Sequence, residues 1–487
     1  MKRNSLIALL IGFLALSVST DASAASPSRL ITPRDAARHG LKRAWYTQVP
    51  IDPGRSRVSH LRLFERNGQV PDTLFVQTDR AVVHAIDAET GQTLWMRAVG
   101  SETHPSMAVG ANDKLVGVVN GTKLYLLDRS NGRILWTRTT KGVPADGPVL
   151  TSHYAFVPMI SGQVLAYAIE KKRAEEEEED SLLEPKASAE GEPKEEPTSL
   201  PKTKPQDTDA KERPIELEEQ LLAPLTCVSF GRVTSQPVFT HEDLKNQYVA
   251  WSTTKGLFVG NVDLRSRDEF AVKYQLRTRS QIVTQPTYLP PNGGTGRREG
   301  LVFVTSEMGD VYAISATRGT EIWQYVIGQP IVEPVIPIGQ RVYVATELDN
   351  FFCLEAITGN EHWSTRGVSQ FIAAGKNKIY TADPSGQIRV LDAQSGRHID
   401  TIAAADLPLK FRNLRTDRIY LATPTGLIQC LHEIDQREPL RYRKAPAPHV
   451  EATPGKEPNP AEEPAEPEEN PFVPPDESGP NPFLEAA

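Results

Sequence analysis

The chain has 487 residues, enough for one large repeat-built domain or for two or three ordinary domains. Its formal net charge of −8 is unevenly divided, because residues 171–220 hold 17 acidic against 9 basic residues and residues 444–487 hold 10 against 2, which leaves a mildly basic remainder. Three widely spaced cysteines, Cys227, Cys353 and Cys430, exclude a disulfide framework, although the sequence leaves open whether any two of them pair. No CxxC or CxxCH pattern supports a zinc knuckle or a covalent haem.

The N-terminus predicts export. Basic residues at positions 2 and 3 precede an apolar run over 6–18, and small residues at 22–24 form a cleavage site, so residues 1–24 are expected to be a signal peptide followed by a segment over 25–40. An uncleaved membrane anchor is the alternative, but the run is short for a bilayer. No cysteine follows it to carry a lipid, and no later stretch predicts a transmembrane span. We therefore expect a periplasmic or extracellular protein.

One pattern recurs along the chain. Residues 82–100, VVHAIDAETGQTLWMRAVG, return at 123–142 as KLYLLDRSNGRILWTRTTKG, and again at 309–328 and 349–367. Residues 385–403 keep the turn but lose the tryptophan. Each unit reads as short strands rich in β-branched residues and separated by glycine-bearing turns. Four strands in a period of about 40 residues predict a blade of a β-propeller.

The blade count follows from the third strand of each unit. The eighth unit lacks an outer strand, and residues 41–50, LKRAWYTQVP, supply one that has no blade of its own. The sequence thus predicts an all-β, eight-bladed propeller of four-stranded antiparallel blades over residues 41–443, closed by the N-terminal strand. Seven blades and a decayed half-repeat are the alternative. The third strands are expected to end near Asp87, Asp128, Ile169, Asp263, Ser315, Glu355, Asp392 and His432.

The repeat (V/L)YxxDxxTGxxxW resembles that of the PQQ-type, quinoprotein-like propellers, over roughly residues 41–440. This family includes quinoprotein alcohol dehydrogenases and the non-catalytic BamB-like proteins of outer-membrane β-barrel assembly. The resemblance implies that each tryptophan docks one blade on the next, and its indole N–H suits a backbone carbonyl. This structural role is expected for Trp45, Trp95, Trp136, Trp323 and Trp363, whereas Trp251, in a second strand, does not match the pattern.

The turn residues of the repeat have physical reasons of their own. A glycine tolerates the positive φ of the turn, and an aspartate accepts hydrogen bonds from turn amides. We expect these structural roles for Asp87, Gly91, Asp128, Gly132, Gly319, Gly359, Asp392 and Gly396.

Catalysis is not expected. The resemblance to quinoprotein dehydrogenases implies adjacent cysteines, calcium ligands and an aspartate base, but this sequence has no adjacent cysteines and no carboxylates at ligand spacing. The GxSxG, HExxH and GxxxxGK[ST] motifs are also missing. We predict no catalytic, cofactor-binding or metal-binding residues, and PQQ with calcium is not expected. A PQQ-dependent dehydrogenase or degenerate quinoprotein remains the alternative, and a sensor propeller with a small ligand in its tunnel is a further one.

Both acidic segments, 171–220 and 444–487, are predicted to be disordered, because their composition buries too little apolar surface. Each follows a third strand, so both are expected to leave from the same face of the propeller. The tail carries the tripeptide NPF twice, which could be a docking motif. Its residues are Asn470, Pro471, Phe472, Asn481, Pro482 and Phe483.

These observations predict an exported, non-catalytic, monomeric scaffold that binds protein partners and does not bind nucleic acid. The resemblance implies a setting in the cell envelope or in outer-membrane protein assembly. The chain departs from the lipoprotein pattern of BamB-like proteins because it lacks the lipid-acceptor cysteine.

Overall fold

The structure of the chain is a computed structural model that describes residues 30–66, 70–169, 223–243, 245–264, 269–291 and 298–442. The predicted signal peptide, the acidic insertion and the tail with both NPF motifs lie outside the described residues. The described residues all belong to one compact unit, Met1–Lys444.

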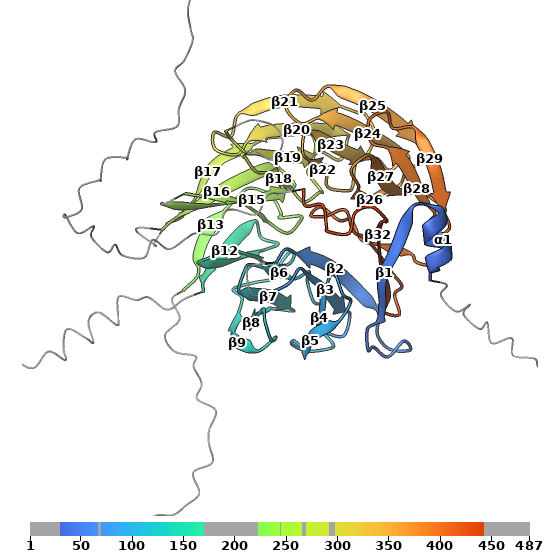
Figure 1. Ribbon diagram of the computed structural model, residues 1–487. Helices are drawn as coiled ribbons and strands as arrows, with labels where there is room; N and C mark the ends of the chain where they lie inside the picture. Colours follow the sequence, from blue (N-terminus) through green and yellow to red (C-terminus); the bar gives the residue numbers. More distant parts are fainter. Residues whose placement is uncertain are drawn as a thin grey trace, which may run out of the picture. The chain divides into compact units, whose positions relative to one another are not determined.

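Eight four-stranded antiparallel sheets form the blades of a propeller ring (Figure 1). Blades 1 to 4 contain, from the inner to the outer strand, β2 (Val58–Phe64), β3 (Thr73–Thr78), β4 (Val82–Asp87) and β5 (Thr93–Ala98); β6 (Gly110–Ala111), β7 (Leu115–Asn120), β8 (Lys123–Asp128) and β9 (Ile134–Thr139); β10 (Val149–Leu150), β11 (Tyr154–Pro158), β12 (Gln163–Ala168) and β13 (Leu225–Val228); and β14 (Val238–Glu242), β15 (Asn246–Thr253), β16 (Gly256–Asp263) and β17 (Phe270–Leu276).

Blades 5 to 8 follow the same order, except that the N-terminal strand completes blade 8. They contain β18 (Thr287–Leu289), β19 (Leu301–Thr305), β20 (Asp310–Ser315) and β21 (Glu321–Val326); β22 (Ile336–Ile338), β23 (Arg341–Ala345), β24 (Asn350–Glu355) and β25 (Glu361–Arg366); β26 (Gln370–Ala374), β27 (Lys378–Ala382), β28 (Ile388–Asp392) and β29 (His398–Ile402); and β30 (Leu409–Lys410), β31 (Ile419–Ala422), β32 (Leu427–Glu433) and β1 (Leu41–Gln48).

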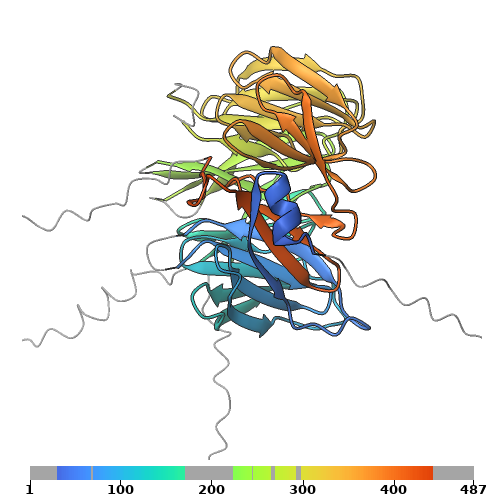
Figure 2. The same cartoon turned by 45° about the vertical axis from the view of Figure 1, so that its right-hand side comes forward.

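The N-terminal strand closes the ring as predicted. β1 runs antiparallel to β32, with Trp45 opposite Cys430. A short helix that the sequence did not predict, α1 (Pro33–Arg38), precedes β1, and Figure 2 shows it beside that strand. The Thr32 hydroxyl caps this helix by accepting a hydrogen bond from the backbone N–H of Asp35 at 3.1 Å.

The predictions of an all-β fold and of eight blades are confirmed, and the seven-bladed alternative is wrong. The third strands end at the expected residues or one residue away from them. The middle strands of a blade are buried on both faces, as in β3, where all six residues are buried, because the next blade covers each face. Outer strands such as β5 bury only their tryptophan, which explains the mixed apolar and polar sequence of the fourth strands.

Candidate interaction surface

The turns between the third and fourth strands are built alike in five blades. In blade 1, the Asp87 carboxylate accepts hydrogen bonds from the backbone N–H groups of Glu89 and Thr90 at 2.9 and 3.0 Å. Gly91 has a φ of +74°, which a residue with a side chain rarely adopts. Similar φ angles, from +69° to +75°, occur at Gly132, Gly319, Gly359 and Gly396. Asp128 and Asp392 also accept from amides of their own turns.

Each of these glycines lies under an aromatic ring from the preceding blade. A Cβ atom at Gly91 would lie 2.6 Å from Cδ2 of Trp45, and one at Gly132 would lie 2.5 Å from Cε3 of Trp95. The indole N–H then donates to the carbonyl of the first turn residue, directly after the third strand. We call this unit of ring, glycine and carbonyl a blade joint. The indole hydrogen bonds run from Trp45 to Ala88 (3.0 Å), Trp95 to Arg129 (2.8 Å), Trp323 to Ala356 (3.0 Å) and Trp363 to Ala393 (3.2 Å).

Sequence reasoning missed the ring of the fifth joint, which is Tyr274 in β17. Its hydroxyl donates to the Ala316 carbonyl at 2.8 Å, and a Cβ atom at Gly319 would lie 2.3 Å from its Cγ. Tyr274 pairs with Val259 just before a register shift, as Trp323 pairs with Ala313 in the next blade. Only an aromatic residue in a fourth strand marks this position in the sequence.

Three blade-to-blade contacts depart from this pattern. Trp136, expected to form a joint, is half-buried, and its indole N–H has no hydrogen-bond partner in the described part of the chain. Leu225 takes the ring position in blade 3. Asp400 takes it in blade 7, where its carboxylate lies 2.5 Å from Nδ1 of His39, the C-cap residue of α1.

Trp251, which fitted no repeat position, packs where blade 3 meets blade 4. It is fully buried in a cluster with Phe156 and Phe270, and its indole N–H donates to the Ser229 hydroxyl at 3.0 Å. A buried aromatic side chain therefore joins these two blades from β15 instead of from an outer strand.

Reactive groups in the described residues are few. The three cysteines are free and buried, and burial raises the pKa of Cys227 to about 12 and of Cys353 to about 11. No three His, Cys, Asp or Glu side chains within the described ranges are grouped so that they could hold a metal ion. Of the helices that the structure describes, none has the length and apolar character needed to cross a membrane.

Polar side chains connect non-adjacent blades near the inner strands. Arg62 of β2 in blade 1 donates to the side-chain oxygen of Gln236, next to β14 in blade 4, at 3.2 Å. Arg412, next to β30 in blade 8, pairs with Glu333, next to β22 in blade 6, at 3.0 Å. Because these blades are not neighbours, both contacts reach across the interior of the ring.

One face of the ring is formed by the turns between second and third strands and by the connections from each blade to the next. Backbone hydrogen bonds hold turn and connection together, as from Ile160 to Val143 at 3.0 Å and from Glu347 to Pro330 at 2.9 Å. We call this the connection face. Six large apolar side chains are exposed on it, including Phe230 at 71% and Met308 at 70%. These six are Val143, Ile160, Phe230, Met308, Val332 and Leu348.

These apolar residues belong to blades 3, 5 and 6 and to the connections that begin at blades 2, 3 and 5. Exposed basic residues occupy the same face around blades 2 to 4, whereas Glu307 and Glu347 lie in turns of blades 5 and 6. The connection face is thus apolar and charged over blades 2 to 6. Its exposed basic residues there are Lys141, Arg232, Lys255, Arg277 and Arg279.

The comparisons with known proteins agree with this architecture. The family model "Outer membrane protein assembly factor BamB" matches residues 57–201 and 251–408. A curated protein of that description from Burkholderia pseudomallei (strain K96243) is 31% identical over 99 residues, which are 20% of this chain and only 26% of the relative's own length.

Solved structures show the shared fold alone, because their sequence identities are low. The BamB structure from Moraxella catarrhalis has a TM-score of 0.50 at 14% identity and covers 80% of this chain and 98% of its own. Saccharomyces cerevisiae Sqt1 has a TM-score of 0.54 at 8% identity and covers 80% of this chain and 97% of its own.

Proposed function

Because the chain belongs to the family of the outer membrane protein assembly factor BamB, we propose that it is an exported, non-catalytic scaffold that binds protein partners during outer-membrane protein assembly. The single observation that carries this proposal is the row of exposed apolar side chains on the connection face. Exposed apolar patches with a polar rim are typical of protein-interaction sites. The periplasm is the compartment that suits this function.

The composition of the connection face indicates what kind of partner it binds. Aromatic and methionine side chains such as Phe230 and Met308 are common in the buried centre of interfaces. The basic residues around blades 2 to 4 favour a partner surface with acidic side chains, and such charges steer association and set register. We therefore expect one partner segment with apolar anchors that lie beside carboxylates.

Photo-crosslinking in the native envelope tests the proposal. A photoreactive amino acid at position 230 is expected to capture one specific partner, whereas the same amino acid at position 96 is not. Met96 is a matched control because it is 53% exposed but lies on β5, at the outer rim of blade 1. Equal labelling from both positions, or no adduct from position 230, would argue against the connection face as the binding surface.

Substitution tests the assembly role separately. Phe230→Asp combined with Met308→Asp places two charges among the apolar residues, so outer-membrane β-barrel proteins are expected to decline in these cells. Met96→Asp is expected to leave their amounts unchanged. The tail is a second proposed contact, and removal of residues 444–487 is expected to weaken partner recovery if its NPF motifs dock. Normal β-barrel amounts in the double variant would refute the assembly role.

A further inference from the structure

The contact between blades 2 and 3 presents the same residue types as the joint between blades 1 and 2, but its hydrogen-bond donors are not satisfied. In the earlier joint, Trp95 donates to Arg129, and two residues later Arg97 donates through Nε to the carbonyl of Gly132 at 3.0 Å. Trp136 and Arg138 repeat this spacing on β9. In blade 3, the Ile169 carbonyl takes the place of the Arg129 carbonyl but accepts no hydrogen bond from Trp136, and the residues that would correspond to Gly132 lie outside the described residues.

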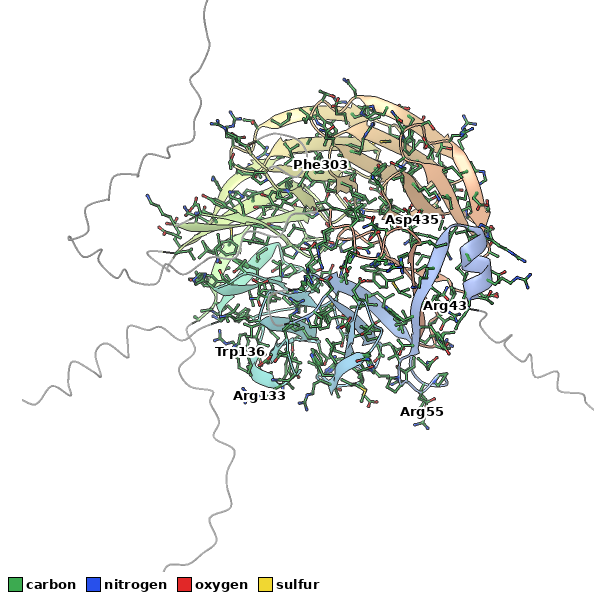
Figure 3. The ribbon with its side chains drawn as sticks, in the orientation of Figure 1. Arg43, Arg55, Arg133, Trp136, Phe303 and Asp435 are labelled. Carbon is green, nitrogen blue, oxygen red and sulfur yellow. The ribbon has the colours of Figure 1, made fainter. Side chains whose placement is uncertain are left out.

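The donors of this pair are buried and unsatisfied. The Trp136 indole N–H and the Nε and Nη1 atoms of Arg138 are inaccessible to water and have no hydrogen-bond partner in the ranges that the structure describes. Buried donors in native proteins nearly always have a hydrogen-bond partner, so these donors call for a partner from outside the described residues. Figure 3 shows Trp136 at the outer rim of blade 2, and the side chains of Trp136 and Arg138 are only partly buried although these donor atoms are covered.

Aromatic rings fix the position of the guanidinium. The Arg138 side chain lies 4.4 Å from the ring centre of Trp136 and 5.8 Å from that of Tyr167, which is buried on β12. These cation–π contacts hold the planar group in one orientation. Burial lowers the pKa of Arg138, and none of the ion pairs among the described residues includes it. A ligand of this site must therefore be negatively charged.

We propose that Trp136 and Arg138 form a carboxylate-binding site at the outer rim between blades 2 and 3. A carboxylate accepts charge-assisted hydrogen bonds from a guanidinium group, and its remaining lone pairs suit the indole N–H. Two sources provide this chemistry. One is the chain's own run Glu175–Asp180, which begins six residues after Ile169, the last described residue before the insertion. The other is an acidic segment of a partner protein.

NMR of the mature full chain labelled with 15N-tryptophan tests the site. The indole N–H signal of Trp136 is assigned by its loss in Trp136→Phe. A hexaglutamate peptide is titrated into the wild-type chain and into a chain whose residues 175–180 are changed to glutamine and asparagine. If the insertion supplies the carboxylate, neutralising it moves the Trp136 signal and hexaglutamate moves it back. If a partner supplies it, neutralising the insertion changes nothing and hexaglutamate moves the signal in both chains.

Arginine substitution identifies the binding group. Arg138→Gln is expected to weaken hexaglutamate binding at least about tenfold, since charge-assisted hydrogen bonds are lost. Arg133→Gln is the matched control, because Arg133 is an exposed base in the turn of the same blade and appears beside Trp136 in Figure 3. The proposal is overturned if hexaglutamate moves the Trp136 signal in neither chain, or if Arg138→Gln binds it as tightly as Arg133→Gln does. A neutral peptide of equal length should have no effect.

Discussion

The blade joint between blades 1 and 2 predicts an unequal response to one substitution at two glycines. Gly132 and Gly328 have almost the same φ, +70° and +71°. A Cβ atom at Gly132 would lie 2.5 Å from Cε3 of Trp95, whereas one at Gly328 would meet no atom within 4 Å. Alanine at either site therefore has the same backbone cost, and only alanine at Gly132 collides with a ring.

The magnitudes separate the two variants. The left-handed backbone costs an alanine about 1–2 kcal/mol at both sites. Overpacking adds about 1–3 kcal/mol at Gly132, and loss of the Trp95 hydrogen bond adds about 1 kcal/mol more. We expect Gly132→Ala to lower the free energy of unfolding by about 2–4 kcal/mol more than Gly328→Ala does.

Urea denaturation of the mature chain measures this difference, read as a shift in midpoint at constant m-value. A double variant provides the control. In a Trp95→Leu background, most of the excess cost of Gly132→Ala should disappear, since the ring that causes it is gone. Equal destabilisation at Gly132 and Gly328, or an unchanged excess in the Trp95→Leu background, would refute the joint as a source of ring stability.

Three further predictions concern individual contacts. Tyr274→Phe loses a hydrogen bond to a blade 5 carbonyl and should lower the free energy of unfolding by about 1 kcal/mol. Tyr46→Phe, at an exposed ring, should change the free energy of unfolding little. Equal effects of the two variants in urea titrations would contradict this prediction. His84 is buried with no partner for either ring nitrogen in the described chain, and burial lowers its pKa from 6.5 to about 4. The unfolded chain therefore binds a proton at His84 below pH 6.5, whereas the folded chain does so only near pH 4, so stability should fall by up to about 3 kcal/mol between these pH values. Between pH 7 and pH 4.5, the melting temperature of His84→Phe should therefore fall less than that of the wild-type chain. The hydrogen bond from His39 holds the pKa of Asp400 below 3.8, so the stabilisation of the folded state by this pair is present above pH 3.8 and is lost as the pH falls through the folded pKa. Asp400→Asn should lower the melting temperature at pH 5 but not at pH 2. An equal drop at both pH values would count against the pair.

The ring of blades could be predicted from the sequence because most copies of the repeat contain the residues that set its turn and its outer strand. A turn glycine and a tryptophan at fixed spacing predict a fourth strand, and Trp45, which has no blade of its own, predicts the closing strand. The connection face could not be predicted in the same way. Its apolar residues, such as Phe230 and Met308, lie in turns and connections whose lengths differ between blades, so no period relates them.

The substituted joints were beyond sequence reasoning for a different reason. Tyr274 performs the contacts of a tryptophan, but tyrosine is too common in strands to mark a joint. Asp400 replaces a ring because its partner is His39, near a chain terminus, and no repeat copy contains that residue. Contacts across the ring, such as Arg62 with Gln236, depend on which side chains face inward from inner strands, whose lengths differ between blades, and from the residues beside them.

The positions of the regular joints divide the ring into two arcs. Joints with an aromatic ring over a glycine connect blades 8, 1 and 2 and, separately, blades 4, 5, 6 and 7. Among the residues that the structure describes, blade 3 has no such joint on either side, and the contact between blades 7 and 8 relies on Asp400 and His39. Both irregular regions border a blade in which no short turn joins the third and fourth strands. In blade 3 the acidic insertion separates these two strands, and in blade 8 they come from opposite ends of the propeller sequence.

Residues after β32 compensate at the second of these regions. The Tyr442 hydroxyl donates to the Ala374 carbonyl of blade 7 at 2.6 Å, and Arg441 pairs with Asp72, just before β3 of blade 1. Arg418 of blade 8 is buried and donates to the Gln436 carbonyl at 3.2 Å. The segment thereby bridges blades 7, 8 and 1, and so spans the contact between blades 7 and 8, where an aromatic joint is missing. No comparable segment provides hydrogen-bond acceptors for Trp136 and Arg138 within the described residues. The rim between blades 2 and 3 therefore keeps buried donors that a ligand with acceptor groups could satisfy.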